Sequence, residues 1–292
     1  MKTQSIAFSL ILLGSLALTG CGGTAPAAAP KVEKQTFESG TTMDKLATAG
    51  TIRIGTKFDQ PGYGLKGLDG KPEGFDVEIG KIIAAKLGIA ADKIEWVETP
   101  SKVREESIIQ GKVDMITATY VVTDERRERV GFGGPYYMAG SDLMVKADNT
   151  AITGPESFKS GGLKVCAGVG SIDGDKLKPH LADPTNQLVE FDVLSKCEDA
   201  LRTGQVDAMT AGDSILNGLA ATNKDTYKVI GKPFFVQPYG VGMTKGDTKF
   251  CEFVNKTLKD AAADGSYERA WKETAGKDID KVAQLPEPAP CA

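Results

Sequence analysis

The sequence predicts an α/β protein with two similar lobes, and three observations lead to this fold class. From Thr51 onward, short apolar segments typical of strands alternate with segments of helical periodicity. Residues 105–118 recur in similar form as residues 198–211, at a constant offset of 93 positions (198 − 105). The chain has 292 residues, which is ample for a sizeable core and for more than one compact unit.

The first 20 residues have the pattern of an export signal. Lys2 precedes an apolar run from Ile6 to Leu18, and small residues lead to Cys21. The run is too short and too early to cross a bilayer as a mature helix. It resembles a bacterial lipoprotein signal, in which the cysteine is acylated and becomes the new N-terminus; the alternative is a plain secretory signal with an incidental cysteine. We therefore expect a lipid anchor at Cys21, on the extracytoplasmic face of the cell membrane.

Composition narrows the classes of partner and cofactor. Residues 21–41 are rich in Ala, Pro, Gly, Lys and Glu, so we expect a flexible tether with little to bury. The formal net charge is −4 and basic residues are interspersed with acidic ones, which argues against nucleic acid as a partner. The sequence has one histidine, His180, and no Cys-x-x-Cys motif, so no metal or cofactor is expected.

The segment that follows Thr51 is typical of a strand–helix–strand unit. Strands are expected at Thr51–Gly55 and Ile94–Val97. Asp76 is a candidate N-cap of the helix between them, and Gly88 is a candidate for the residue just beyond its C-terminus. Such a unit favours a largely parallel sheet covered by helices. The helix itself is predicted from five apolar residues at helical spacing: Phe75, Ile79, Ile82, Ile83 and Leu87.

Each copy of the repeat is predicted to form an amphipathic helix that ends at a glycine, followed by a buried strand. The alternative is that the two copies are unrelated, because helix-Gly-x-Val-Asp-strand is a common local arrangement. If the copies mark two lobes, the carboxyl ends of both strands are candidates to face one cleft. Open α/β sheets bind ligands beyond these ends. The repeat therefore places Thr119 and Tyr120 of one lobe opposite Gly212 and Asp213 of the other.

Four cysteines remain after Cys21, and an even set in an exported chain predicts two disulfides with three possible connectivities. We favour Cys166–Cys197, because one residue lies on the predicted strand Leu163–Ala167 and the other on the helix that feeds the next strand of the same lobe. We favour Cys251–Cys291 for the second pair, because it would hold the proline-rich C-terminal tail against the last helical region.

Five motifs between Met43 and Gly276 are informative when taken together. They are Gly74-Phe75-Asp76-Val77, Val113-Asp114-Met115-Ile116, Thr123-Asp124-Glu125-Arg126, Phe132-Gly133-Gly134-Pro135-Tyr136-Tyr137 and Asp264-Gly265-Ser266-Tyr267. With these motifs the chain resembles one family, the extracytoplasmic solute-binding proteins of ABC importers for polar amino acids. Lys57–Gly62 and Val165-Cys166 are most similar to the glutamate-binding branch of actinobacteria.

The resemblance implies a two-lobed periplasmic-binding-protein type II fold, with mixed, mostly parallel sheets and a hinge of two crossover strands. Lobe I would hold residues 42–139 and 239–292, and lobe II would hold residues 140–238. Met138–Asp142 and Val236–Gly240 are similar to the two crossings.

The resemblance also implies a set of ligand-binding residues. Arg126 matches the arginine that grips the ligand's α-carboxylate bidentately; without the resemblance, it would read as a solvated charge in the run Asp124–Arg129. From lobe I, Thr119 offers a hydroxyl and a backbone amide, and Tyr120 follows it. From lobe II, the backbone N–H groups of Gly170 and Ser171 are candidates for the carboxylate. Lys57 and Gln60 are candidates to bind a side-chain carboxylate of the ligand. The alternative is that both are solvent-exposed loop residues.

Three positions depart from the family's pattern for glutamate. Val121 stands where the family has a second Ser or Thr, and Ile172 stands where it has a Thr. The family's ammonium-binding aspartate falls on Gly212, with Asp213 one residue later. In a strand, one residue turns a side chain to the other face, so Asp213 would serve only if the chain bends at Gly212.

The sequence thus predicts a monomeric binding lipoprotein, not an enzyme, that delivers a small polar solute to an ABC permease in the membrane. The expected solute is an amino acid, with glutamate favoured. Two alternatives remain open at this point: a ligand sensor for a membrane receptor, and a dehydratase-like enzyme on the same fold. The catalytic alternative lacks a Gly-x-Ser-x-Gly elbow, and the single histidine lies in Lys178-Pro179-His180-Leu181, a surface-like segment.

Overall fold

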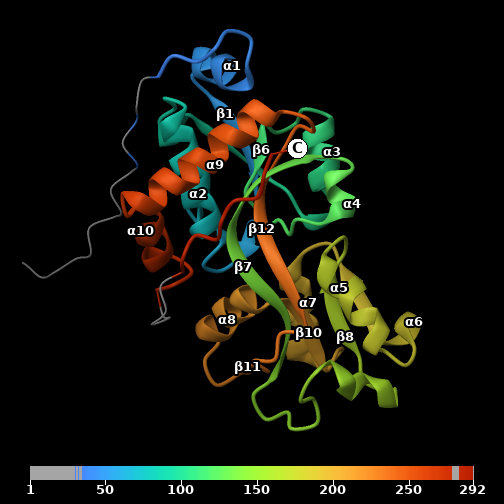
Figure 1. Cartoon of the computed structure of the whole chain (residues 1–292). Helices are drawn as coiled ribbons and strands as arrows, with labels where there is room; N and C mark the ends of the chain where they lie inside the picture. Colours follow the sequence, from blue (N-terminus) through green and yellow to red (C-terminus); the bar gives the residue numbers. More distant parts are fainter. Residues whose placement is uncertain (1–29, 31, 33–34, 278–282, 292) are drawn as a thin grey trace, which may run out of the picture.

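The structure of the protein is a computed structural model, which describes residues 30, 32, 35–277 and 283–291. The expected signal peptide, the lipidation residue Cys21 and most of the expected tether lie outside the described residues. Two lobes lie one above the other in Figure 1. Two long strands, β7 (Gly131–Lys146) and β12 (Phe235–Met243), run from one lobe into the other and hold them together.

Lobe I, the upper lobe in Figure 1, carries the N-terminal elements and the last two helices. Its strands are β1 (Ile52–Thr56), β2 (Asp59–Gln60), β3 (Gly64–Lys66), β4 (Pro72–Glu73), β5 (Ile94–Glu98) and β6 (Met115–Ile116). Its helices are α1 (Thr42–Ala49), α2 (Phe75–Lys86), α3 (Arg104–Ile109), α4 (Asp124–Arg127), α9 (Thr248–Ala263) and α10 (Ser266–Glu273), with short 3₁₀ helices at Ala91–Lys93 and Ser101–Val103.

Lobe II is formed by the chain between the crossover strands. Its strands are β8 (Val165–Gly168), β9 (Leu188–Phe191), β10 (Ala208–Gly212) and β11 (Tyr227–Val229). Its helices are α5 (Ile172–Leu177), α6 (Pro184–Gln187), α7 (Leu194–Thr203) and α8 (Asp213–Thr222), with short 3₁₀ helices at Pro155–Ser160 and Lys178–His180.

One mixed sheet runs through both lobes in the order β5-β1-β6-β12-β7-β10-β8-β9, with β11 paired to β7. Within lobe I, β1 pairs in parallel with β5 and β6, and within lobe II, β8 pairs in parallel with β9 and β10. The crossover strands pair antiparallel with each other and with their neighbours. This confirms the predicted α/β class and the two crossover strands. The expected lobe boundaries, 139/140 and 238/239, fall inside β7 and β12 and stay a prediction.

The internal repeat is visible in the hydrogen bonds of the two lobes. In lobe I, Arg53 N donates to Asp114 Oδ2 over 2.8 Å, and Asp114 N donates back to Arg53 O over 2.9 Å. In lobe II, Lys164 N donates to Asp207 Oδ2 over 2.7 Å, and Asp207 N donates back to Lys164 O over 2.8 Å. Asp207 and Asp114 are 93 residues apart (207 − 114), so the sequence repeat encodes the same start of a parallel strand pair twice.

Helix α2 shows one confirmed and one wrong expectation. Gly88 follows the C-cap Leu87 with a φ of +83°, as a residue beyond a helix C-terminus does. Asp76, however, is not the N-cap. The N-cap is Gly74, because the helix begins at Phe75, and Asp76 is fully buried inside the first turn. Its carboxylate accepts hydrogen bonds from Tyr136 Oη at 2.6 Å and from Thr119 N at 2.7 Å.

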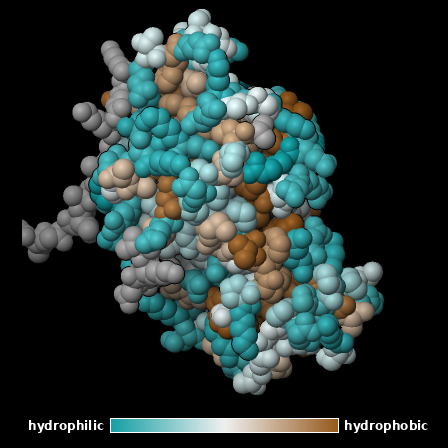
Figure 2. Space-filling view, in the orientation of Figure 1, coloured by the Kyte–Doolittle hydropathy of each residue, from teal (hydrophilic) through white to brown (hydrophobic). Residues whose placement is uncertain are grey.

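Buried apolar side chains form three clusters, and the largest includes residues of both lobes, such as Ile54 and Met209. Packing is therefore continuous across the crossover strands. Figure 2 shows hydrophilic residues over much of both lobes, with several hydrophobic residues near the middle of this face. Met138 on β7 and Val236 on β12 are 45% and 61% exposed. Within the described residues, no helix is both long and apolar enough to span a membrane.

Both favoured disulfides are present. Cys166 on β8 is bonded to Cys197 on α7, and Cys251 on α9 is bonded to Cys291. The second bridge holds the C-terminal segment against α9, where Asn255 Nδ2 also donates to Ala289 O over 2.9 Å. Because each bridge closes a loop of 31 or 40 residues, it removes many conformations from the unfolded chain.

We predict that the double change Cys251→Ala and Cys291→Ala lowers the free energy of unfolding by roughly 3–4 kcal/mol, from loop-closure entropy. Denaturant titration of the oxidised wild type and the variant measures the difference. Reduced wild type lacks the other bridge as well, so it should unfold at a still lower denaturant concentration. Equal unfolding midpoints for oxidised wild type and variant would contradict a stabilising role for this bridge.

Candidate functional site

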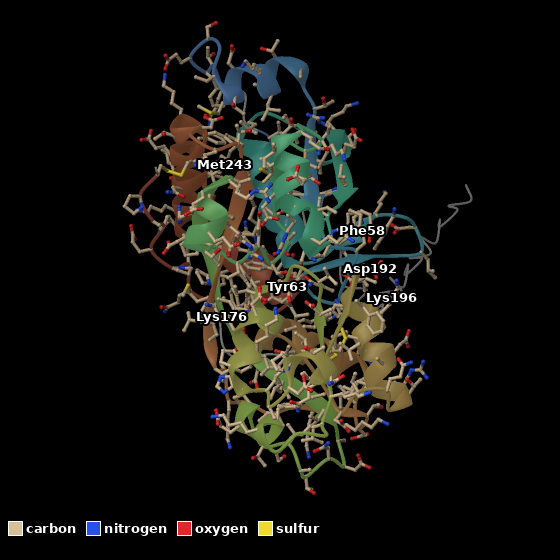
Figure 3. The ribbon with its side chains drawn as sticks, turned by 90° about the vertical axis from the view of Figure 1, so that its right-hand side faces the viewer. Phe58, Tyr63, Lys176, Asp192, Lys196 and Met243 are labelled. Atoms are coloured by element: carbon tan, nitrogen blue, oxygen red, sulfur yellow. A yellow bond between two sulfur atoms is a disulfide. The ribbon has the colours of Figure 1, made fainter. Side chains whose placement is uncertain are left out.

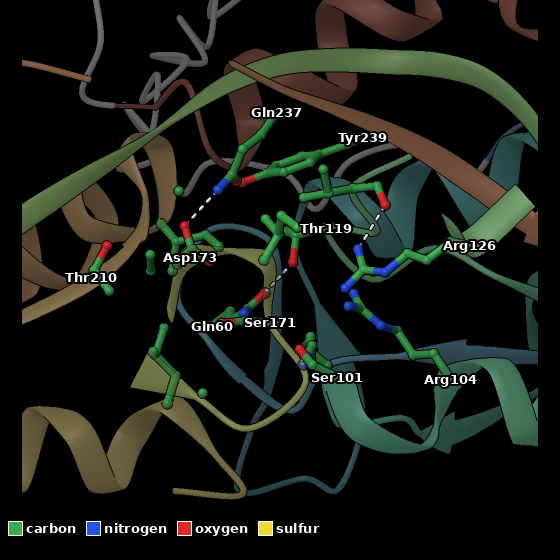
Figure 4. A pocket seen from close by; sticks show the side chains of 18 of the residues that line it. Gln60, Ser101, Arg104, Thr119, Arg126, Ser171, Asp173, Thr210, Gln237 and Tyr239 are labelled. Atoms are coloured by element: carbon green, nitrogen blue, oxygen red, sulfur yellow. Dashed lines mark hydrogen bonds between the residues drawn. The ribbon is translucent and has the colours of Figure 1, made fainter. Parts of the chain in front are cut away.

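A small cavity of about 40 Å³ lies between the lobes, and Figure 4 shows it from close by. Lobe I faces it with the loop after β1, the start of α3 and the segment after β6. Lobe II faces it with the loop after β8, the start of α7 and the end of β10, while β12 forms one wall. Its lining residues include Lys57, Gln60, Ser101, Arg104, Thr119, Val121, Arg126, Gly168, Ser171, Ile172, Asp173, Asp192, Leu194, Thr210, Gly212, Gln237 and Tyr239.

Direct hydrogen bonds across the cavity show that the lobes are closed. Arg126 Nη2 of lobe I donates to Gly170 O of lobe II over 2.9 Å. Gly170 has a φ of +75°, and a Cβ placed on it would lie 2.8 Å from the Cα of Lys102, so the close approach requires a glycine. A solute of any size therefore needs the lobes to part before it enters.

A second contact between the lobes lies at the edge of the cleft, where Figure 3 shows Phe58 of lobe I close to Asp192 and Lys196 of lobe II. Asp59 Oδ2 accepts hydrogen bonds from the backbone N–H of Leu194 at 2.7 Å and of Ser195 at 3.3 Å. These are the first residues of α7, whose own N-cap, Val193, makes no side-chain cap. Asp59 thus caps the helix of the opposite lobe.

Three cationic side chains of lobe I line the cavity: Lys57, Arg104 and Arg126. Lys57 and Arg104 are buried, 7% and 2% exposed. Lys57 Nζ donates to Ser101 Oγ over 2.8 Å. The guanidinium carbons of Arg104 and Arg126 lie 4.2 Å and 5.4 Å from the centre of the Tyr120 ring, so one aromatic ring attracts both cations. Figure 4 shows the two guanidinium groups side by side.

The guanidinium of Arg126 contacts three groups of the protein and still has N–H donors that are not used. Nη1 donates to Val121 O over 2.7 Å, Nη2 donates to Gly170 O, and Nε lies 3.3 Å from Glu105 Oε1. A guanidinium has five N–H groups, and each Nη carries two of them. One N–H on each Nη is therefore left to donate to a ligand, and a carboxylate is a strong acceptor for such groups.

Two buried polar atoms of the lining have no hydrogen-bond partner among the described residues: Arg104 Nε and Ser171 Oγ. Burial of an unpaired polar group costs about 1–3 kcal/mol, and more for a charged one. Arg104 Nη1 is bonded to Ala118 O at 3.0 Å, so the side chain is fixed while its Nε stays unpaired. Orphaned donors at a cavity wall are positions where a bound ligand supplies the missing partner.

Burial and mutual repulsion weaken the protonation of these cations. Desolvation, followed by the nearby charge of Arg104, lowers the pKa of Lys57 to about 7. Desolvation, followed by the charge of Arg126, lowers the pKa of Arg104 to about 10. Desolvation is the larger cause of each shift, and repulsion between the cations adds to it. An anion placed between these groups would act in the opposite direction and favour their charged forms.

Asp173 is the buried acid of the lining, 6% exposed, in the first turn of α5. Its Oδ1 accepts hydrogen bonds from Ser141 Oγ at 2.9 Å and from Gln237 Nε2 at 2.5 Å. Burial raises the pKa of Asp173, while these two donors act in the opposite direction. Asp192 also lines the cavity, but its carboxylate is about half exposed and pairs with Lys196 at 2.7 Å.

Thr119 contributes its hydroxyl but not its amide. Thr119 Oγ1 lies 3.0 Å from Gln60 Oε1, whereas Thr119 N donates to the buried carboxylate of Asp76 over 2.7 Å. In this structure the amide of Thr119 is therefore engaged by Asp76, and the hydroxyl is the group that Thr119 can offer to a ligand. Desolvation raises the pKa of Asp76 to about 7. The φ of Thr119 is +45°, a strained value for a β-branched residue, which the bond to Asp76 helps to hold.

The structure brings together five of the eight predicted ligand residues at the cavity wall: Lys57, Gln60, Thr119, Arg126 and Ser171. Tyr120, Gly170 and Asp213 are not among the lining residues. Tyr120 lies behind the two arginines, and Gly170 turns its carbonyl, rather than its amide, toward Arg126. Asp213 Oδ1 accepts from Gly140 N at 3.1 Å and Ser214 N at 2.7 Å, outside the cavity. The direct roles of all eight residues with a ligand stay predictions.

The sequence analysis missed Ser101, Arg104, Asp173, Gln237 and Tyr239, all at the cavity wall. Arg104 had a signal, because it precedes the buried Ser107 and Ile108 by three and four residues and so shares their helical face. Asp173 lies two residues beyond Ser171 in the same loop-to-helix segment. Gln237 and Tyr239 alternate on β12 and share one face, a period that also indicates shared orientation.

His180, the single histidine, lies outside the cavity. Its Nδ1 is 2.6 Å from Glu156 Oε1, at the surface of lobe II, and its ring packs edge-on against Phe234. The position agrees with the surface location that the sequence indicated.

Comparisons with known proteins agree with this arrangement. The chain is 36% identical over 287 residues to the glutamate-binding protein GluB of Corynebacterium efficiens, covering 95% of this chain and 92% of that protein. It is 33% identical to the ABC transporter glutamine-binding protein GlnH of Bacillus subtilis, covering 93% and 94% of the two chains.

Solved structures show the same fold. An ancestral arginine-binding protein bound to glutamine matches with a TM-score of 0.71 and 31% identity, covering 77% of this chain and 97% of that one. The solute receptor for L-cysteine of Neisseria gonorrhoeae matches with a TM-score of 0.76 and 27% identity, covering 84% and 100%. The fold is thus the predicted type II fold of amino-acid-binding proteins. Bacterial extracellular solute-binding proteins, family 3, match residues 52–276, so the chain belongs to that family.

Proposed function

We propose that this protein captures an acidic amino acid, with glutamate favoured, by closing its lobes around it and delivers it to an ABC permease. The observation that carries the proposal is the gathering of Lys57, Arg104 and Arg126 around one cavity whose buried acid is Asp173. Glutamate carries two carboxylates and one ammonium, which matches this excess of positive charge. Relatives named for glutamate and glutamine support a polar amino acid as the solute class.

Charge distinguishes an acidic ligand from a neutral one. The guanidinium groups of Arg104 and Arg126, which both contact the Tyr120 ring, repel each other; Arg104 is 2% exposed and the side chain of Arg126 is 11% exposed. Removing one carboxylate partner from a buried cation costs several kcal/mol. Arg126 already has Glu105 3.3 Å from its Nε, so Arg104 and Lys57 gain most from an added negative charge. An acidic amino acid brings two carboxylates to these three cations, whereas glutamine brings one.

The proposal includes export and a lipid anchor at Cys21, on the extracytoplasmic face of the cell membrane. It is supported by the apolar run and small residues that precede Cys21, and by the two disulfides, which form and persist in oxidising compartments. We propose that the protein acts as a monomer, because one chain supplies every residue that lines the cavity. The proposed role is binding and release, in which the solute undergoes no chemical change.

A thermal-shift panel of the twenty amino acids and common organic anions tests the solute class. We expect glutamate or aspartate to give the largest rise in melting temperature, because a ligand at 100 times its Kd stabilises a protein by about 2.7 kcal/mol. Arginine and lysine should give none, since their side chains repel the cavity's cations. A largest shift from a basic or apolar amino acid would refute the proposal.

Replacement of Arg126 by alanine should weaken binding of glutamate at least about 100-fold, because two charge-assisted hydrogen bonds to a carboxylate are lost. Isothermal titration calorimetry measures the change. Arg127→Ala is the matched control: its guanidinium lies over the Phe132 ring, away from the cavity, so affinity should be unchanged. Equal affinities for wild type and Arg126→Ala would show that the ligand does not bind at Arg126.

Binding should take up protons at pH 8. The pKa of Lys57 is lowered to about 7, so most Lys57 side chains are neutral at pH 8 in the empty protein. A bound anion favours the charged form and raises this pKa, and the proton comes from the buffer. The measured binding enthalpy should therefore increase with the ionisation enthalpy of the buffer. Lys57→Met should abolish this dependence; the same dependence in the variant would show that another group takes up the proton.

A further inference from the structure

An acidic amino acid needs an anion for its ammonium group, and the two obvious candidates in lobe II do not provide one. Gly212 has no side chain, and a Cβ placed on it would lie 2.0 Å from Tyr239 Oη and 3.0 Å from Gln237 Oε1. The hydroxyl of Tyr239 therefore occupies the space that a side chain at this position would enter. No aspartate fits there without displacing a fully buried tyrosine.

Asp213, the next residue, binds backbone amides outside the cavity. Its Oδ1 accepts from Gly140 N and from Ser214 N, which fastens the start of α8 to the crossover strand β7. It is not part of the cavity wall. The backbone changes from strand to helix at this point, since β10 ends at Gly212 and α8 begins with Asp213, but the Asp213 carboxylate binds Gly140 N and Ser214 N and does not line the cavity.

Asp173 differs from Asp213 in lying at the cavity wall, and one of its two carboxylate oxygens has no side-chain donor among the described residues. It lines the cavity, and both of its side-chain donors, Ser141 on β7 and Gln237 on β12, bind Oδ1. Within the described part of the chain, no side chain donates to Oδ2. Gln237 is itself oriented by Tyr239, whose Oη donates to Gln237 Oε1 over 3.2 Å. The residue that fills the space at Gly212 thus also supports the partner of Asp173.

We propose that Asp173 binds the ammonium group of the solute, in place of a carboxylate at the end of β10. The inference rests on the proposed function, since it concerns the amine of an amino acid. Figure 4 shows Asp173 on the opposite side of the cavity from Arg104 and Arg126, with Thr119 and Ser171 between them. The cavity is therefore polarised, with its anion at the wall of lobe II and the crossover strands and its cations at the wall of lobe I. This separation matches an amino acid that points its amine one way and its carboxylates the other.

Two ligands that differ only in the amine test this assignment: L-glutamate and glutarate. Asp173→Asn removes the charge but keeps an oxygen that accepts from Ser141 and Gln237. We expect it to weaken L-glutamate at least about 10-fold, the loss of one charge-assisted hydrogen bond, while glutarate binds as well as before or better. Binding of glutarate also shows that the variant is folded. Calorimetric titration of both ligands measures the two changes.

Asp213→Asn is the matched control, and it should leave the ratio of the two affinities unchanged. Equal losses for both ligands in Asp173→Asn would mean that Asp173 only positions the crossover strands, and the assignment would be overturned. A loss of selectivity in Asp213→Asn instead would transfer the role to Asp213 and equally overturn it. If wild type binds neither ligand, the proposed function itself fails, a result distinct from the other two.

Discussion

Repulsion between like charges in a small, buried space is the constraint on which the site depends. Two guanidinium groups and one ammonium group face the same cavity, and each would be more stable in water. Much of the surrounding structure limits this cost: the Tyr120 ring lies under both arginines, Glu105 lies beside Arg126, and the carbonyls of Ala118 and Val121 accept from the guanidinium groups. The positive charge that these contacts leave uncompensated is the physical basis for proposing an anionic solute.

The elements of the fold were predictable because local and global signals agree. Apolar residues at helical spacing gave α2, and the repeated Val-Asp pattern gave the strands β6 and β10 with their preceding helices. The aspartates of that pattern, Asp114 and Asp207, each bind the backbone at the start of a neighbouring strand. Because the same backbone contact occurs in both lobes, the aspartate that makes it occurs at the same place in both copies of the repeat, and the repeat therefore indicates it.

The site was predictable only in part, because a pocket between lobes joins residues that no local pattern connects. Arg126 and Thr119 were found through the resemblance and the repeat. Asp76 was misread as a cap because its partners, Tyr136 and Thr119, lie 60 and 43 residues away in sequence. Asp173 was missed because its orientation is set by Ser141 and Gln237 on two separate strands. The local sequence around a residue does not reveal which distant residues its side chain will contact in the fold.

The cap that Asp59 places on α7 belongs to the shut molecule alone. When the lobes separate, water replaces Asp59 at the helix end and solvates its carboxylate, so the contact favours closure by only about 1–2 kcal/mol. Such an energy changes the ratio of shut to open molecules by a factor of roughly 5–30. This contact therefore shifts the equilibrium of the empty protein toward the shut state. Because its energy is small, the same contact is readily broken when the lobes part again.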